Sequence, residues 1–167
     1  DIRGGEAVDR SNFYGSASDY EDVEANMITA KVIHDLGGSL TLTSTTRYGK
    51  TQMDRVLTGI NALAAPSADP ATWTVSRSRQ RVDQSNEILA NQTILTGSFD
   101  TGVLMHDFST GIEALYEAQK SRSFSATGLT IPAAPLYNPD ADIALATPFA
   151  TGASASGSTT TLAAFLF

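Results

Sequence analysis

The chain lacks cysteine altogether, since none of its 167 residues is a Cys. Disulfides, thiolate metal sites and cysteine nucleophiles are therefore excluded together. Positive charge is also scarce: 11 Lys and Arg residues stand against 18 Asp and Glu residues, and the formal net charge is -7. A protein that binds nucleic acid needs clustered cations that are not neutralised nearby. The composition therefore predicts no nucleic-acid partner.

Long apolar runs are missing as well. A run such as Leu162–Phe167 is far shorter than the roughly 20 residues that a helix needs to cross a bilayer. A helical membrane protein is therefore excluded. Helical periodicity is also weak, because Ile112–Lys120 fits two helical turns but fits a two-residue period equally well. We expect strands and almost no helix.

Catalytic motifs are not found either. The sequence contains no G-x-S-x-G, no H-E-x-x-H and no phosphate-binding glycine loop. Glu113 and Glu117 lie four positions apart, which in a strand separates them by about 13 Å, more than a two-carboxylate glycosidase requires. His34 and His106 each lie near a predicted turn, but two imidazoles are too few ligands for a metal site. We therefore expect no enzyme, no catalytic residue, no cofactor and no metal.

What the sequence does contain is a series of long alternating segments. Polar and apolar residues alternate in a way that predicts strands, and paired glycines or an Asp-Thr-Gly sequence mark tight turns between them. Stretches rich in Pro, Ala, Ser and Gly predict two longer loops. The expected strands are 20–36, 39–57, 73–99, 103–123 and 158–167, the turns are 37–38 and 100–102, and the loops are 59–71 and 125–158.

The clearest alternation follows the second turn. Leu104, Phe108, Ile112 and Tyr116 fall on one face, together with the residues between them at even positions. The opposite face carries the polar residues Asp107, Ser109, Glu113 and Glu117. We expect the first face to contact lipid and the second to line a polar lumen.

The order of the connections is the most informative feature. Tight turns alternate with long loops, and strands of about 16 to 25 residues are much longer than the usual 5 to 6 residues. Both features are typical of outer-membrane β-barrels, which have short periplasmic turns and long external loops. The sequence therefore predicts an all-β antiparallel meander that forms part of a transmembrane β-barrel. A secreted soluble β-rich binding module or adhesin fragment remains the alternative, and a hydrolase comes third.

Several motifs resemble one family. Val8-Asp9-Arg10-Ser11-Asn12-Phe13-Tyr14-Gly15 and the Ser18–Asp22 stretch resemble the barrel of TonB-dependent outer-membrane receptors of the ferric-siderophore, or catecholate, type. Further similar segments cover most of residues 8 to 139. They are Lys31–Gly37, Leu40–Leu42, Thr45–Lys50, Ile88–Thr93, Phe99–Gly102 and Leu136–Pro139.

This resemblance implies a 22-stranded barrel in the outer membrane of a Gram-negative bacterium, closed by an N-terminal plug. It also implies a ferric siderophore as ligand, energy from the TonB complex, and contacts with outer-membrane lipid and lipopolysaccharide. Residues 1–167 would supply about five strands and two external loops, because both ends of the chain look cut. The plug domain would lie outside this chain.

Four residues are candidates for ligand contact: Arg55, Trp73, Arg77 and Tyr137. Arginine can pair with an anionic chelate, and aromatic faces can stack on a catechol. The structural alternative is that the arginines pair with a plug carboxylate and that the aromatic residues pack in loops or form an interface girdle. The acidic run from Asp19 to Glu24 has two interpretations as well, either a solvated strand extension or a cation site that bridges lipopolysaccharide.

Overall fold

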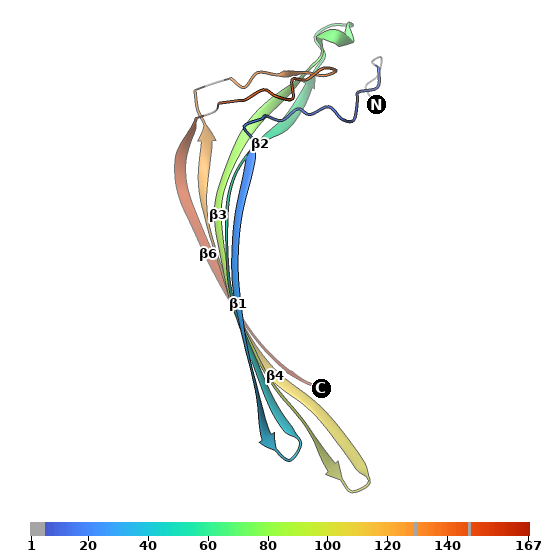
Figure 1. Ribbon diagram of the computed structural model, residues 1–167, viewed down its shortest axis with the longest axis vertical. Coiled ribbons are helices and arrows are strands. Elements are labelled where there is room, and N and C mark those ends of the chain that lie inside the picture. Colours follow the sequence, from blue (N-terminus) through green and yellow to red (C-terminus); the bar gives the residue numbers. More distant parts are fainter. Residues whose placement is uncertain (1–5, 129, 147) are drawn as a thin grey trace. The chain divides into compact units, whose positions relative to one another are not determined.

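The computed structural model describes residues 6–128, 130–146 and 148–167. The predicted segment covers residues 1–167, but residues 1–5, 129 and 147 lie outside the described residues. Residues 129 and 147 belong to the predicted 125–158 loop. The described ranges form five long strands, one short strand and one 3-10 turn, η1 at Pro70–Thr72 (Figure 1). The strands are β1 Tyr20–Gly37, β2 Leu40–Ala64, β3 Thr74–Thr101, β4 Leu104–Ala126, β5 Ala134–Pro135 and β6 Phe149–Leu166.

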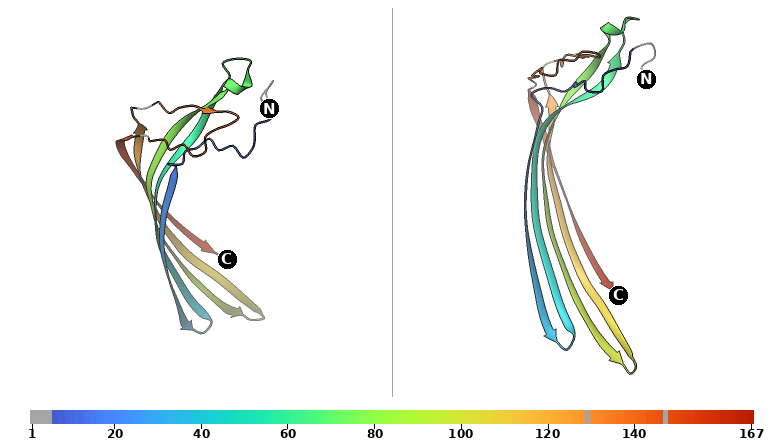
Figure 2. Two further views of the ribbon diagram at one scale, coloured as in Figure 1. Left: turned by 45° about the horizontal axis from the view of Figure 1, so that its top comes forward. Right: turned by 45° about the vertical axis from the view of Figure 1, so that its right-hand side comes forward.

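The strands form one antiparallel sheet in the order β1-β2-β3-β4-β6, which is a meander (Figure 2). β5 pairs with β3 instead, with Thr74 opposite Pro135 and Val75 opposite Ala134. The predicted all-β antiparallel fold is confirmed, and residues 109–121 lie in a strand rather than a helix. Among the residues that the structure describes, no helix is both long enough and apolar enough to cross a membrane.

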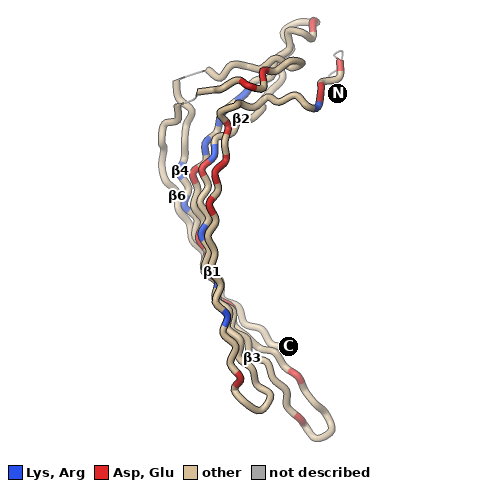
Figure 3. The backbone as a smooth tube through the Cα atoms, viewed as in Figure 1, with Lys and Arg blue, Asp and Glu red and all other residues tan. Residues whose placement is uncertain are grey.

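Both predicted tight turns are present, but each lies slightly further along the chain: the residues between the strands are 38–39 rather than 37–38, and 102–103 rather than 100–102. Gly37 and Gly38 have φ values of 86° and 69°, and Gly102 has a φ of 70°. These positive values suit glycine because it has no Cβ atom to clash with the backbone. The Asp35 carboxylate accepts a hydrogen bond of 2.8 Å from the Gly37 N–H, which supports the first turn. Acidic positions near both turns are visible in red in Figure 3.

The predicted loop boundaries need correction. β2 continues to Ala64, so residues 59–64 of the predicted 59–71 loop belong to a strand. β6 begins at Phe149 rather than at 158, so the Gly/Ser/Ala stretch belongs to the sheet. The physical reason is pairing with the neighbouring strand: the Ser123 hydroxyl donates to the Ala153 carbonyl at 3.0 Å, and Gly152 leaves room for that side chain.

The chain divides into two compact units, and each is described by itself. The first unit comprises the described residues of Asp1–Val23, Met53–Asp83 and Ser121–Ser154. The second comprises Glu24–Gln52, Gln84–Lys120 and Ala155–Phe167. The first unit thus contains the long connections, and the second contains both tight turns.

The first unit has a small hydrophobic cluster where β3 begins. Trp73, Val75 and Leu136 are buried there, and Val8, Tyr14 and Tyr137 pack against them. Three separate segments thus share one apolar core. This core holds the long connections against the start of β3.

The second unit has two chemically different faces. On one face, the Phe99 ring stacks on His106 at 5.0 Å between centroids and lies 6.2 Å from the Phe108 ring. On the other face, the Gln92 amide donates to Glu113 at 3.4 Å. Ile112 is 62% exposed in the isolated chain. The assignment of these faces to lipid and lumen stays a prediction.

Candidate functional site

Arg77 holds two chain segments through their backbone. Its Nε and Nη2 donate to the Pro132 carbonyl at 3.0 and 2.8 Å, and its Nη1 donates to the carbonyls of Tyr14 and Gly15 at 3.2 Å each. The side chain is buried, with 7% of its residue surface exposed. These contacts occupy the guanidinium, so Arg77 fixes the amino-terminal segment and the β4–β6 connection in place.

Arg79, a second buried arginine two positions further along β3, also holds separate chain segments together. The Arg79 guanidinium lies 3.0 Å from the Asp19 carboxylate and also donates to the carbonyls of Ser18 and Leu145. Asp19 in turn accepts from the Thr58 N–H at 3.0 Å and the Thr58 hydroxyl at 2.8 Å. We name this group of residues the β3 latch. It ties the residues just before β1, strand β2 and the β4–β6 connection to β3.

Sequence reasoning missed the β3 latch. The signal that could have indicated it is the Arg-x-Arg-x-Arg pattern from Arg77 to Arg81, which places three cations on one face of a strand. Charged side chains are seldom buried without partners. Such a row therefore predicts pairing with carboxylates or carbonyls from elsewhere, and Arg81 likewise pairs with Asp54 at 2.9 Å.

Trp73 is buried and is bonded to neighbouring segments of the first unit. It is 7% exposed, its ring belongs to the hydrophobic cluster, and its Nε1 donates to the Ser67 carbonyl at 3.0 Å. The Trp73 carbonyl accepts from the Leu136 N–H at 2.9 Å. The structure thus brings Trp73 together with Tyr137, which packs against the same cluster.

Arg55 has a different environment. Its Nη1 lies 3.4 Å from the Glu21 carboxylate, and the two side chains are 37% and 48% exposed. An exposed pair of this kind is weak, worth about 0 to 1 kcal/mol. Arg55 is therefore the candidate arginine that can change partners at little cost.

The long connections border an open pocket of about 630 Å³ in the first unit. Its lining comes from three segments: residues 6–12, Pro70 and Ala71 of η1, and residues 135–138. We name it the outer pocket. The Tyr137 hydroxyl donates to the Glu6 carbonyl at 3.2 Å, and the Asn12 amide donates to the Tyr137 carbonyl at 3.1 Å. These bonds join the walls of the outer pocket to one another.

Two acidic residues, Glu6 and Asp9, are among those that line the outer pocket. Asp9 accepts hydrogen bonds from the Ser11 N–H at 2.9 Å and the Ser11 hydroxyl at 2.8 Å. These bonds hold the pKa of Asp9 below its ordinary value of 3.8, because they stabilise the ionised carboxylate. Asp9 is therefore negatively charged at neutral pH.

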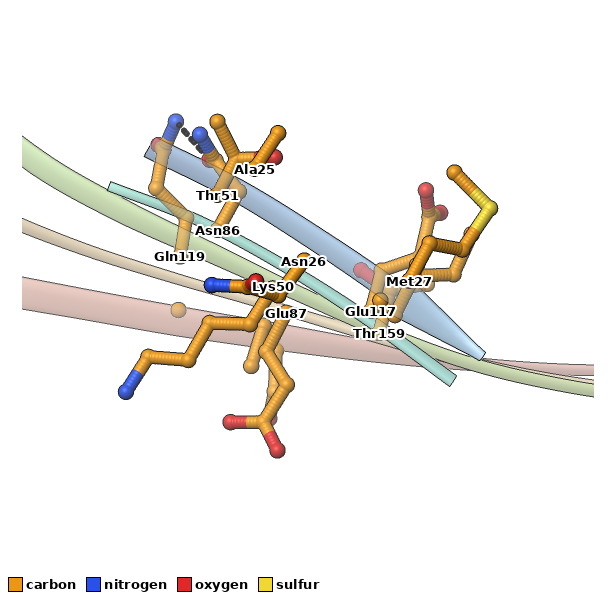
Figure 4. Close-up of a pocket in the computed structure, with 15 residues that line it drawn as sticks. Ala25, Asn26, Met27, Lys50, Thr51, Asn86, Glu87, Glu117, Gln119 and Thr159 are labelled. Carbon is orange, nitrogen blue, oxygen red and sulfur yellow. Dashed lines mark hydrogen bonds between the residues drawn. The ribbon is translucent and has the colours of Figure 1, made fainter. Parts of the chain in front are cut away.

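The second unit has a hollow of about 570 Å³ on its sheet. The Gln119 amide donates to Asn86 at 3.1 Å there (Figure 4). Figure 4 shows Lys50 and Glu87 pointing to the opposite side of the sheet from these two amides. The amides offer uncharged hydrogen-bonding groups. Within the described parts of the chain, no three His, Cys, Asp or Glu residues lie close enough together to hold a metal ion.

Comparison with known proteins gives the family. No family model matches the chain. The catecholate siderophore receptor Fiu of Escherichia coli K12 is 38% identical over 164 residues, which cover 96% of this chain and 21% of Fiu. The crystal structure of the ferric-catecholate import receptor Fiu in its open form matches with a TM-score of 0.83 and 37% identity, over 96% of this chain and 25% of that one. The chain belongs to the TonB-dependent outer-membrane receptors.

Two further relatives support this assignment. The probable TonB-dependent siderophore receptor PiuA of Acinetobacter baumannii is 33% identical over 115 residues, 68% of this chain and 15% of PiuA. The probable TonB-dependent receptor BfrD of Bordetella pertussis is 35% identical over 107 residues, 64% of this chain and 14% of BfrD. The chain spans about a fifth of the length of Fiu.

The comparisons thereby confirm the resemblance to TonB-dependent receptors that the sequence motifs indicated. The meander matches a portion of the Fiu structure, and the relatives are transport receptors rather than enzymes. The four candidate ligand residues stay predictions. Of these, Trp73 and Tyr137 share the hydrophobic cluster, Arg77 binds two segments of the first unit, and Arg55 is paired with Glu21.

Proposed function

We propose that the intact receptor takes up a ferric siderophore across the outer membrane, with energy from the TonB complex. The match to Fiu carries this proposal, because it combines 38% identity over 96% of the chain with a TM-score of 0.83 to a ferric-catecholate import receptor. Residues 1–167 supply barrel wall and external connections and carry out no chemistry. The plug domain and the TonB contact belong to other parts of the receptor.

Within this proposal, the four candidate residues have two roles. Arg55 and Tyr137 contact the ligand, because Arg55 is exposed and weakly paired and Tyr137 lines the outer pocket. Trp73 and Arg77 hold the external connections in position, because both are buried and engaged with neighbouring segments.

The negative net charge of the chain opposes an anionic ligand. Two further cations of the first unit, Arg79 and Arg81, are paired with the carboxylates of Asp19 and Asp54. An anionic chelate that displaces Glu21 from Arg55 would lose little, since exposed ion pairs contribute about 0 to 1 kcal/mol. Arg55 is therefore the proposed source of local attraction.

Lipid contacts complete the proposal. The face of β4 that carries Phe108 and Ile112 contacts the hydrocarbon core. Asp19 is engaged with Arg79 and Thr58, and Glu21 is paired with Arg55, so the acidic start of β1 offers the exposed Asp22 and Glu24 for cations that bridge lipopolysaccharide.

The experiment is growth of iron-starved cells on a ferric catecholate as the iron source. Deletion of the receptor gene should abolish growth, and a plasmid copy should restore it. Replacement of Arg55 by Gln should raise the chelate concentration needed for half-maximal growth, whereas Arg47→Gln, a change at another exposed arginine of β2, should not. Normal growth of the deletion strain on the chelate, with growth on a vitamin or glycan impaired instead, would refute the siderophore assignment.

A further inference from the structure

Two chain segments that are far apart in the sequence are bonded to each other in the first unit. They are residues 6–19, which lead into β1, and residues 130–146, which belong to the β4–β6 connection. Figure 2 shows both segments at the same end of strands β2 and β3. We name the two segments together the external clasp.

The bonds between the two halves of the external clasp gather around a buried serine. The Ala17 N–H and the Ser16 hydroxyl both donate to the Ile143 carbonyl, at 2.8 and 3.0 Å. The Ser16 hydroxyl also accepts from the Leu145 N–H at 2.9 Å, and the Ser18 hydroxyl donates to the Leu145 carbonyl at 2.8 Å. Ser16 is 2% exposed and Leu145 is 7% exposed. Water therefore has little access to the contact between the halves.

Contacts with β3 hold both halves of the external clasp in place. Arg77 and Arg79 are buried, and each donates to carbonyl groups of both halves. β5 lies in the second half and pairs with β3, so it is part of the sheet. Segments that move during function are expected to have few buried contacts. The external clasp has many such contacts, whereas residues 60–69 at the outer end of β2 are all exposed.

A second observation comes from the crystal structures of Fiu. Its closed form matches this chain with a TM-score of 0.82, and its open form matches with 0.83, each over 96% of the chain. Because the matched share includes nearly all of the chain, a clasp that opened in one form should lower the score for that form. The two forms instead match almost equally well. The part of Fiu that corresponds to this chain is therefore similar in both forms.

We propose that the external clasp stays closed while the receptor takes up its ligand. This inference rests on the proposed function and deepens it, because it assigns this part of the external surface to a fixed wall rather than to a moving gate. Tyr137 belongs to the external clasp and lines the outer pocket, so it is presented to the ligand in one position. Such a preformed contact loses little conformational entropy when a ligand binds.

The first test measures whether a buried position of the external clasp becomes accessible during uptake. Ser16→Cys places a thiol between the two halves, where a membrane-impermeant maleimide can reach it only when the clasp opens. Opening separates the buried Arg79–Asp19 pair, so this thiol should be labelled at least about a hundredfold more slowly than that of the exposed control Ser11→Cys. Addition of a ferric catecholate to cells that express the intact receptor should leave both rates unchanged. Faster labelling of Ser16→Cys with the chelate would overturn the proposal.

The second test locks the external clasp without changing a buried residue. Ala17→Cys and Ala144→Cys replace exposed alanines of the two halves, beside the bond between Ala17 and Ile143, and a short bismaleimide then joins the two thiols. Cells with the cross-linked receptor should take up iron as fast as cells with the untreated double variant. The two single variants, treated in the same way, control for the modification itself. Loss of uptake only in the cross-linked double variant would show that the clasp has to open.

The outcomes separate this proposal from the proposed function. Normal uptake by wild-type cells with loss of uptake after cross-linking would overturn the closed clasp and leave siderophore uptake intact. Failure of wild-type cells to take up iron from the chelate would refute the proposed function. The labelling test would then decide the clasp alone, because equal labelling rates for Ser16→Cys and Ser11→Cys without chelate would show that it is open.

Discussion

Replacement of Arg79 by Met should release the external connections from the sheet. The Arg79 side chain is 3% exposed, and that of its partner Asp19 is 15% exposed. Methionine keeps the length of the side chain but leaves the Asp19 carboxylate without its cation and two backbone carbonyls, those of Ser18 and Leu145, without their donor. Loss of one member of a buried ion pair costs about 3 to 5 kcal/mol.

That cost has a measurable consequence. Since about 1.4 kcal/mol is a factor of ten, undocking of the connection between β4 and β6 should become at least about a hundredfold more frequent. Limited proteolysis of the receptor in outer-membrane vesicles measures this, because cleavage follows the open population when reclosing is fast. Addition of Asp19→Asn to Arg79→Met should restore part of the protection, since no uncompensated charge then remains.

The matched control is Arg55→Met, which breaks the exposed pair with Glu21 in the same unit. Its effect on proteolysis should be small, because exposed pairs contribute about 0 to 1 kcal/mol. If Arg79→Met were cleaved no faster than Arg55→Met, the β3 latch would have no role in docking and the argument from burial would be wrong.

Three further predictions concern packing and insertion. A Cβ atom at Gly97 would lie 2.5 Å from a leucine methyl carbon, so Gly97→Val should lower the free energy of unfolding by about 1 to 3 kcal/mol in a lipid folding titration. Gly157 has open space around it among the described residues, so the control Gly157→Ala should be neutral. Ile112→Arg should impair insertion into lipid by about 2 to 4 kcal/mol, and equal losses for Ser109→Arg would contradict the assigned faces. Trp73→Ala should lower the stability by about 3 to 5 kcal/mol and speed proteolytic cleavage of residues 130–146, and Trp73→Phe should lower the stability less. A thermal melt that ranks the two variants in the opposite order would show that the Trp73 ring does not stabilise the cluster by packing.

The strands and tight turns could be predicted because their causes are local. Alternation has a period of two in any strand, and Gly37 and Gly102 supply the positive φ that their turns require. The strand ends could not be predicted from composition. Residues 150–158 have a loop-like composition, but β4 provides hydrogen-bonding partners that the sequence does not show.

The candidate site was harder to predict, because burial depends on distant segments. Arg77 and Trp73 are covered by parts of the chain about 55 to 65 residues away, and periodicity does not reveal which segments these are. The Asp19–Arg79 pair spans 60 residues of sequence. By contrast, Tyr137 was placed correctly beside a long connection, since its Pro-rich surroundings predict one.

The most direct test of the account is uptake of radiolabelled iron from a ferric catecholate by cells whose only receptor for it is this one. Residues 130–146 are replaced by a short Gly/Ser linker, so that β4 and β6 stay intact. Wild-type cells should accumulate iron only when TonB is present, and the variant should reach the outer membrane as a folded barrel but accumulate none. Normal iron accumulation by the variant, or accumulation by wild-type cells without TonB, would contradict the account.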